Sequence, residues 1–225
     1  MALKTWWAIP FIQPFSRKLV VFIVNNTGVS ANQITFTSIV FRLITISCFF
    51  STSRSVLAIG AISYFFAYVC DCADGAVARI KKQTTELGRY LDHIADLMGD
   101  IFILTALSYS HGLFGSFMYS GMIFMHISEC YMSYLAGFAI RENFDAASSP
   151  EIFNFFNRYR QWWFSRNIKS FFSFPDYTAF VFVFSVLFGI PKAGLQIGFW
   201  FLLVICLYSI FSTFVSVHSH IKHFP

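Results

Sequence analysis

Long apolar runs separated by short polar stretches make up most of the chain from residue 34 onward. An α-helix needs about 20 residues to cross the hydrocarbon core of a bilayer. Six runs approach this length, and they cover residues 34–53, 55–73, 88–109, 112–138, 176–191 and 193–217. Small residues inside these runs, such as Gly60 and Gly198, favour close packing between helices. The pattern predicts an all-α integral membrane protein built as one six-transmembrane-helix bundle.

The segment before the first run mixes bulky apolar side chains with three basic residues. This mixture is typical of an amphipathic segment at a membrane interface. Pro10 and Pro14 interrupt the segment and disfavour a continuous helix, so an extension packed on the bundle is the alternative. The expected organisation is a single membrane domain over residues 1–225, divided into an interfacial N-terminal segment (1–33), a six-helix bundle (34–217) and a cytoplasmic tail (218–225).

Composition agrees with lipid as the solvent. Charged residues make up only 12% of the 225 residues, against roughly 25% in an average soluble domain. A soluble fold of this size could not hide the 56% of residues that are hydrophobic. The net charge of +5 does not indicate a nucleic-acid partner, because the basic residues are spread over loops between apolar runs.

With six spans, lysines and arginines divide unevenly between the two sides of the membrane. Thirteen fall on one side: Lys4, Arg17, Lys18, Arg79, Lys81, Lys82, Arg89, Arg141, Arg158, Arg160, Arg166, Lys169 and Lys222. The other side has only Arg54 and Lys192. Because positive loops are retained in the cytoplasm, this split predicts that both termini are cytoplasmic.

Four aspartates stand where the second run ends and the third begins. Asp71 and Asp74 are three residues apart, and Asp92 and Asp96 are four apart, so each pair shares one helix face. Carboxylates are costly inside a membrane protein, and four that converge repel one another unless cations neutralise them. Hard oxygen ligands select Mg²⁺, Mn²⁺ or Ca²⁺. We therefore expect a divalent-cation site, with two ions, at the cytoplasmic face.

Two other interpretations of the aspartates are open. They could form salt bridges with the nearby cations of residues 79–89 at a wet helix end. They could also bind cations that a transporter moves, but such acids are expected near the bilayer midplane and in repeated halves. The aspartates begin at a helix end, and the sequence shows no internal repeat.

The residues around the aspartates complete a known pattern. Gly75 and Gly88 lack side chains and let a substrate approach the backbone, and Arg79 offers a planar cation for phosphate. The segment reads D-x-x-D-G-x-x-A-R, eight residues, then G-x-x-x-D-x-x-x-D, filled by Asp71, Asp74, Gly75, Ala78, Arg79, Gly88, Asp92 and Asp96. In this signature the chain resembles the CDP-alcohol phosphatidyltransferases.

The resemblance implies a metal-dependent transfer that releases CMP. It implies that Asp71, Asp74 and Asp92 hold Mg²⁺ or Mn²⁺, and that Asp96 also contacts metal and acts as general base on the acceptor hydroxyl. Contacts to the CDP part of the donor are expected from Asn32, Thr35, Gly75, Ala78, Arg79, Thr85 and Gly88. Family members are commonly homodimers, an assembly that the sequence itself neither supports nor excludes.

An upstream segment supports the same resemblance more loosely. Residues 30–35 read Ser-Ala-Asn-Gln-Ile-Thr and are similar to the family's T-P-N-x-I/L-T segment, with Ser30 and Ala31 in place of Thr and Pro. This places Asn32 near the nucleotide. A helix cap is the other role open to Asn32, and the two can coexist.

The sequence says less about the substrates than about the type of reaction. The donor is expected to be CDP-diacylglycerol with a polar alcohol as acceptor, in phospholipid biosynthesis; the alternative is a soluble CDP-choline or CDP-ethanolamine type donor with a lipid hydroxyl as acceptor. Arg141, Arg158 and Arg160 are candidates for binding the acceptor. The alternative for this loop is a positive-inside segment with an aromatic membrane anchor.

Isolated charges also occur within the apolar runs. Asp100 continues the spacing of Asp92 and Asp96 one turn further and is expected to tune the site or to pair with a polar neighbour. Arg42 and Glu129 are the other isolated buried charges, and we expect them to pair with each other.

Overall fold

The computed structural model describes residues 4–141 and 153–221, and its regular secondary structure within these ranges is helical, apart from an isolated bridge between Lys4 and Ile168. The α-helices are α1 (Gln13–Asn26), α2 (Ala31–Phe49), α3 (Arg54–Ile80), α4 (Glu86–Ser110), α5 (Phe117–Arg141), α6 (Asn154–Phe164), α7 (Phe174–Ala179), α8 (Ser185–Leu187) and α9 (Pro191–Ile221). Two π-helical turns, η1 (Ala8–Ile12) and η3 (Phe180–Phe184), precede α1 and join α7 to α8.

Each predicted apolar run coincides with a helical stretch. The first four runs correspond to α2, α3, α4 and α5, the fifth to α7, η3 and α8 together, and the sixth to α9. By length and composition, α2, α3 and the Pro191–Ser216 part of α9 are sufficient to cross a membrane, and Phe174–Leu187 is a shorter apolar stretch. Length and composition together therefore support three of the six predicted spans among the described residues.

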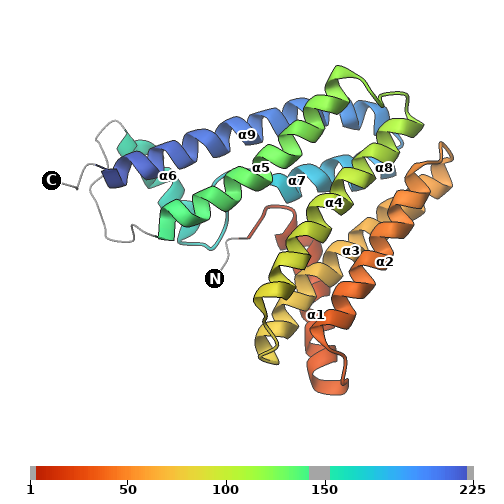
Figure 1. The fold of residues 1–225 in the computed structure, drawn as a ribbon, viewed down its shortest axis with the longest axis horizontal. Coiled ribbons are helices and arrows are strands. Elements are labelled where there is room, and N and C mark those ends of the chain that lie inside the picture. Colours follow the sequence, from red (N-terminus) through yellow and green to blue (C-terminus); the bar gives the residue numbers. More distant parts are fainter. Residues whose placement is uncertain (1–3, 142–152, 222–225) are drawn as a thin grey trace.

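Figure 1 shows two groups of helices. In one group α2 packs against both α3 and α4, and in the other α5 and α9 run side by side. α4 also packs against α5 and α9, and η3 packs against α3 and α9. Fully buried side chains from these elements, such as Leu104, Phe182 and Leu202, form one continuous apolar core between the groups.

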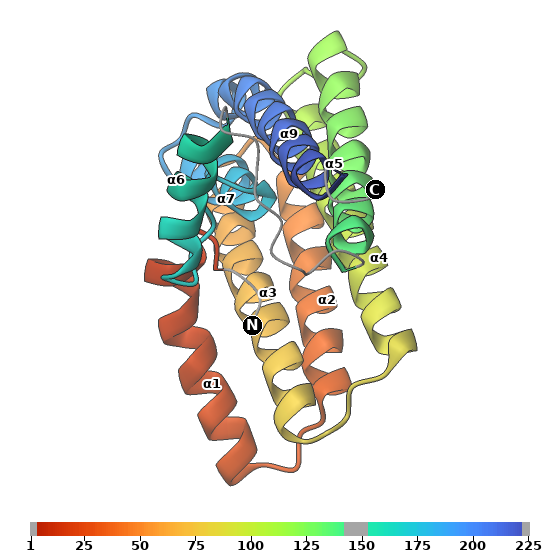
Figure 2. The same ribbon diagram turned by 90° about the vertical axis from the view of Figure 1, so that its left-hand side faces the viewer.

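The N-terminal residues are packed into this core. Trp7 and Ile12 are buried in the same apolar cluster as α3 and η3, and the Trp7 amide donates to a carboxylate oxygen of Asp176 at 2.6 Å. Pro10 lies within η1 and Pro14 in the first turn of α1, where the missing amide hydrogen costs little. Residues 4–12 thus pack on the bundle, as the alternative to an interfacial segment expects. α1 lies beside α3 (Figure 2). Phe15 and neighbouring apolar side chains of α1 are exposed.

A side-chain cap fixes the beginning of α2. The Ser30 hydroxyl accepts from the Gln33 amide at 3.4 Å, and the Gln33 side chain accepts from the Ser30 amide at 2.9 Å. This reciprocal capping box satisfies two amide groups that the helix leaves open. Ser30 is thus the N-cap, so the cap role suggested for Asn32 is wrong, and the Asn32 side chain is left available for a cavity described below.

Candidate active site

Three of the four predicted carboxylates meet between two helices. Asp71 comes from α3, and Asp92 and Asp96 come from successive turns of α4; one oxygen of each lies within 4.8 Å of the other two. α3 continues past the predicted end of its run to Ile80, which keeps the whole Asp71–Arg79 segment helical. Three converging carboxylate oxygens are the donor set that Mg²⁺ or Mn²⁺ prefers, so the residues present fit such an ion.

Asp74 lies one turn further along α3 and is held separately. Its side chain is buried, and one carboxylate oxygen accepts from the Thr35 hydroxyl of α2 at 2.5 Å. Asp74 is therefore outside the cluster of three carboxylates, although it shares a cavity with Asp92. The link to Thr35 fixes the separation of α2 and α3 at this level.

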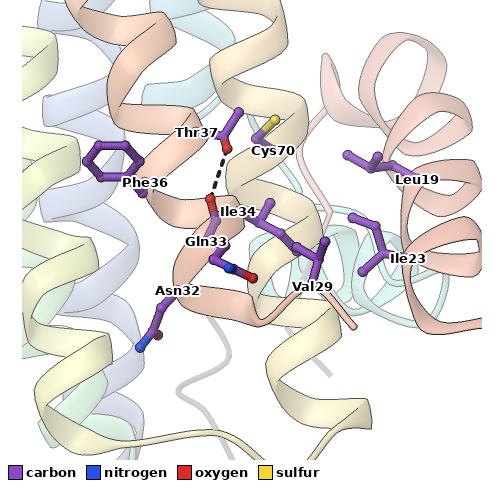
Figure 3. A pocket seen from close by; sticks show the side chains of 9 residues that line it. All are labelled: Leu19, Ile23, Val29, Asn32, Gln33, Ile34, Phe36, Thr37 and Cys70. Atoms are coloured by element: carbon purple, nitrogen blue, oxygen red, sulfur yellow. Dashed lines mark hydrogen bonds between the residues drawn. The ribbon is translucent and has the colours of Figure 1, made fainter. Parts of the chain in front are cut away.

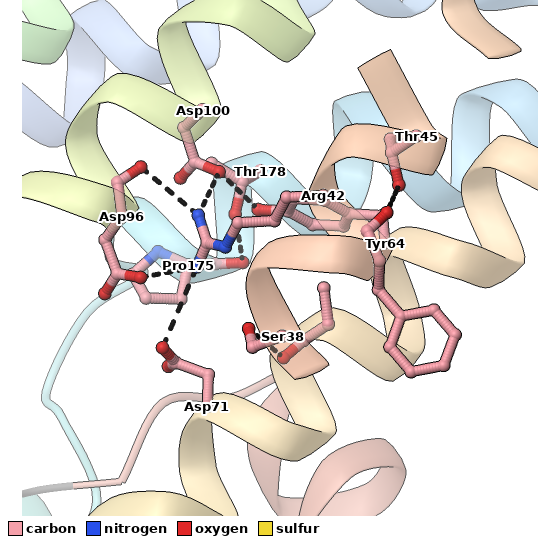
Figure 4. Close-up of polar contacts among 11 residues, drawn as sticks. Ser38, Arg42, Thr45, Tyr64, Asp71, Asp96, Asp100, Pro175 and Thr178 are labelled. Carbon is pink, nitrogen blue, oxygen red and sulfur yellow. Dashed lines mark hydrogen bonds and ion pairs between the residues drawn. The ribbon is translucent and has the colours of Figure 1, made fainter. Parts of the chain in front are cut away.

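A buried arginine connects the acids, as Figure 4 shows. The Arg42 guanidinium, on α2, lies 2.5 Å from an oxygen of Asp96, 3.4 Å from Asp100 and 3.8 Å from Asp71. Its side chain is only 7% exposed. A planar guanidinium can donate to several carboxylates at once, which neutralises part of their mutual repulsion.

The surroundings of Arg42 are built to hold it. Asp100 accepts from the Tyr64 hydroxyl at 3.1 Å with the same oxygen that faces Arg42. A Cβ atom at Gly99 would lie 3.0 Å from the Arg42 side chain, so a glycine at this position makes the close approach of α2 and α4 feasible. The expectation that Asp100 has a polar partner is confirmed.

The expected pair of Arg42 and Glu129 is wrong, and so is the alternative that the aspartates pair with the cations of residues 79–82. Glu129 does not pair with Arg42: its carboxylate accepts from Ser209 at 3.0 Å and from Ser133 at 3.4 Å. The ion pairs of the aspartates go to Arg42 rather than to Arg79, Lys81 or Lys82, as far as the described side chains extend. A single cation in an apolar run does indicate a buried ion pair. Its spacing from other charges along the sequence does not identify the partner.

A polar cavity of about 390 Å³ lies beside the acids, between the first turns of α2 and α4 and the last turns of α3. All seven residues predicted to contact the CDP group line it: Asn32, Thr35, Gly75, Ala78, Arg79, Thr85 and Gly88. Asp74 and Asp92 line the same cavity. The sequence motif thus corresponds to one connected surface, with the carboxylates at its edge.

Thr85 and Gly88 also have a structural task. Thr85 is the N-cap of α4, and its hydroxyl accepts from the Gly88 amide at 3.0 Å. A Cβ at residue 88 would lie 2.9 Å from that hydroxyl, so glycine leaves the cap undisturbed. Gly75 is less crowded, since the nearest atom to its Cβ position is a guanidinium nitrogen of Arg79 at 3.5 Å.

A second cavity, mostly apolar, adjoins the polar one. Its volume is about 550 Å³, and Figure 3 shows it bounded by side chains of α1, α2 and α3, including Leu19, Ile23 and Cys70. Asn32 lines both cavities. One amphipathic molecule could therefore reach from the carboxylates into an apolar space.

The three arginines suggested for the acceptor separate in the structure. Arg160, on α6, lines a small cavity between α5, α6 and α9. Arg158, on the same helix, is exposed and does not line that cavity. Arg141 ends α5, and its side chain is outside the described part of the chain.

An all-helical apolar chain that gathers carboxylates beside a polar cavity has the arrangement expected of a membrane enzyme acting on phosphate esters. The family model for CDP-alcohol phosphatidyltransferases matches residues 28–159, more than half of the chain, and covers α2 to α5 with every residue of the acid motif. The chain belongs to the CDP-alcohol phosphatidyltransferase family. Among curated proteins, the chain has no significant match.

Membership of this family indicates the general type of reaction. The family transfers a substituted phosphate group from a CDP-alcohol to an alcohol, in a membrane-embedded helical protein. Family members generally depend on a divalent metal, and the cluster of Asp71, Asp92 and Asp96 supplies suitable ligands here.

Proposed function

We propose that this protein transfers the phosphatidyl group of CDP-diacylglycerol to a polar alcohol and releases CMP, as a step of phospholipid biosynthesis. The observation that supports this most directly is the polar cavity at the acid cluster, which the seven residues expected to contact CDP line together. The carboxylates at its edge, Asp74 and Asp92, would lie next to the diphosphate of a nucleotide bound there.

The adjoining apolar cavity supports a lipid-linked donor. CDP-diacylglycerol carries its nucleotide and its acyl chains on one molecule, and the polar and apolar cavities share Asn32. A soluble CDP-choline or CDP-ethanolamine type donor would use only the polar cavity. If a lipid hydroxyl were the acceptor, an apolar surface for the acceptor lipid would be needed at the carboxylates, on the side from which the acceptor approaches.

In the proposed reaction Asp71, Asp74, Asp92 and Asp96 would hold Mg²⁺ or Mn²⁺, with two ions expected. Bound there, the ions supply charge neutralisation for the diphosphate and for the departing CMP. Arg79 lines the cavity and would pair with a phosphate oxygen.

Asp96 is the proposed general base. Its side chain is 38% exposed, so an acceptor can reach it, while Arg42 fixes one of its oxygens at 2.5 Å. The acceptor oxygen forms a bond to the phosphorus that carries diacylglycerol, and the bond from that phosphorus to the CMP oxygen breaks. Asp96 takes the hydroxyl proton. A direct displacement of this kind needs no covalent enzyme intermediate.

We further propose six spans with both termini and the active site on the cytoplasmic side. α4 and α5 have 25 residues each, or about 37 Å, which is enough to cross a bilayer. Thirteen basic residues against two support this orientation. A cation transporter is disfavoured because the acids adjoin a cavity lined by the whole nucleotide motif.

The proposal is tested with purified full-length protein in lipid nanodiscs, Mn²⁺ or Mg²⁺, and labelled CDP-diacylglycerol. We expect CMP release that depends on metal and on a polar alcohol, and its loss in Asp96→Asn while donor binding is retained. His93→Gln, an exposed neighbour of the acids, is the matched control and should remain active. Turnover of CDP-choline or CDP-ethanolamine with diacylglycerol, and none with CDP-diacylglycerol, would replace the proposed donor.

A further inference from the structure

A small polar cavity lies apart from the nucleotide cavity, where α5, α6, α9 and the loop before α7 meet. Its volume is about 210 Å³, below the roughly 300–1,000 Å³ typical of pockets for drug-sized ligands. Eight of its fifteen lining residues carry hydroxyl groups and three are charged, although most of the wall area is apolar. A cavity with this lining is suited to a small hydrophilic molecule.

One wall presents an incompletely paired carboxylate. Glu129 is only 7% exposed, and its Oε1 atom accepts from Ser209 at 3.0 Å and Ser133 at 3.4 Å. Its Oε2 atom is buried without a hydrogen-bond partner among the residues that the structure describes. Burial of a carboxylate oxygen without a hydrogen-bond donor costs free energy. A bound molecule that donates to Oε2 would remove this cost.

The other walls present cations. Arg160 donates to the Ser216 hydroxyl at 3.0 Å, and its buried Nε atom has no partner within the described ranges. Lys169 is half-buried and lines the same cavity. Burial lowers the pKa of the Lys169 ammonium, and the carboxylates of Asp176 and Glu129 act in the opposite direction. The cavity therefore holds one anion and two cations.

One wall of the cavity is formed by α5, which packs against the helix of the acid cluster, α4. Cys130 follows Glu129 on α5 and lies within electrostatic reach of both Glu129 and Asp96. α4 and α5 pack against each other, so the carboxylate of the proposed general base and that of Glu129 lie on facing helices. The hydroxyl of a molecule bound at Glu129 would have to extend across the α4–α5 contact to reach the proposed base, Asp96.

We infer that this cavity binds the acceptor, and that the acceptor is a small alcohol carrying both an ammonium and a carboxylate group, that is, a hydroxy amino acid. The inference rests on the proposed function. An ammonium supplies the missing donor to Glu129, and a carboxylate pairs with Lys169 and Arg160.

Other acceptor classes match the charges less well. A phosphorylated alcohol would suit the two cations but would bring a doubly charged group close to the open oxygen of Glu129. An amino alcohol without a carboxylate would leave Arg160 without an anion. A neutral polyol would compensate neither sign of charge. The carboxylate of Glu129 is therefore the feature that selects among acceptors.

The test measures CMP release from CDP-diacylglycerol with four acceptors: L-serine, ethanolamine, glycerol 3-phosphate and myo-inositol. We expect L-serine to give a kcat/KM at least about tenfold above each of the others. Glu129→Gln should raise the KM for L-serine by about tenfold or more and leave the KM for the CDP donor unchanged. Arg160→Gln should also raise the KM for L-serine, whereas Arg166→Gln, an exposed cation of the adjoining loop, should not.

Folding and function are separated within the same experiment. Glu129→Asp keeps the negative charge and should retain a preference for L-serine if Glu129→Gln proves unstable. Preference for one of the other three acceptors would overturn the inference and leave the proposed function intact. Donor binding without CMP release in the presence of L-serine would also overturn it. Failure to bind the donor at all would instead refute the proposed function.

Discussion

The cluster of Asp71, Asp92 and Asp96 (the acid site) and the cavity at Glu129 (the acceptor cavity) differ in how the sequence specifies them. The acid motif occupies residues 71–96, on two consecutive helices, and its spacing places the side chains on defined helix faces. The charged residues of the acceptor cavity, Glu129, Arg160 and Lys169, come from α5, α6 and a loop. Local spacing therefore reveals the chemistry, whereas substrate choice depends on how distant segments pack.

The two regions also treat their charges differently. At the acid site Asp71, Asp96 and Asp100 share the buried Arg42 within the protein. At the acceptor cavity, buried atoms of Glu129 and Arg160 have no partner within the described ranges. We expect changes at the first region to affect every substrate alike, and changes at the second to affect one substrate.

The largest effect should follow loss of a metal ligand. Asp71→Asn should weaken Mn²⁺ binding, and CMP release should fall on the order of 100-fold with every acceptor, because a carboxylate of the ion's own coordination set is removed. Mn²⁺ titration by electron paramagnetic resonance and the CMP assay measure the two quantities. A change of acceptor preference in this variant would abolish the distinction between the regions.

Removal of the shared cation should destabilise the fold. Arg42→Met leaves Asp71, Asp96 and Asp100 facing one another, and we expect the free energy of unfolding to fall by about 2–3 kcal/mol. The loss stays below that of a fully buried pair because Asp96 is 38% exposed. Denaturation in detergent with and without Mn²⁺ checks this, since the ion should restore part of the loss. Arg42→Lys, which keeps the positive charge, should lose less stability than Arg42→Met. Equal stability of the parent protein and both variants would show that Arg42 does not stabilise the three carboxylates.

Acceptor affinity should depend on alkaline pH. Because burial lowers the pKa of Lys169, its ammonium is lost at a lower pH than that of an exposed lysine, near 10.4. The KM for L-serine should therefore rise as pH increases through that range, while the KM for the donor stays constant. Lys169→Arg should reduce the rise to the part that the ammonium of L-serine itself contributes, since that group also loses its proton at alkaline pH. The same pH dependence in Lys169→Arg would assign it to another group.

The smallest effect should come from the cap of α4. Thr85→Val removes the hydroxyl that accepts from Gly88 and should cost about 1 kcal/mol of stability. Thr85→Ser keeps the hydroxyl and should be close to the parent protein. Thermal denaturation measures the cost, and the KM for the CDP donor shows whether the same hydroxyl also contacts nucleotide. A stable Thr85→Val with weakened donor binding would make Thr85 a binding residue only.

The sequence predicts local features of the structure better than contacts between distant segments. The hydropathy pattern predicts the helices because each apolar run is continuous, and the family resemblance predicts seven of the residues that line the polar cavity beside the acids. The partner of Arg42 and the burial of Trp7 were not predicted, since both depend on contacts between distant segments. Asp74 has the spacing of its neighbours, yet Thr35 from another helix holds it apart from the cluster.

The N-terminal residues packed on the loop before α7 also set an order of assembly. Lys4 and Trp6 contact Asn167 and Lys169, and the Trp6 side chain is separated from its acceptor by 163 positions. At about 5–20 residues per second, roughly 10–30 s of translation pass before these partners exist. The helices that carry the acid motif are complete long before then. The proposed acceptor cavity, whose wall includes Lys169 and residues of α9, can therefore close only late in synthesis, well after the helices of the acid motif have been made.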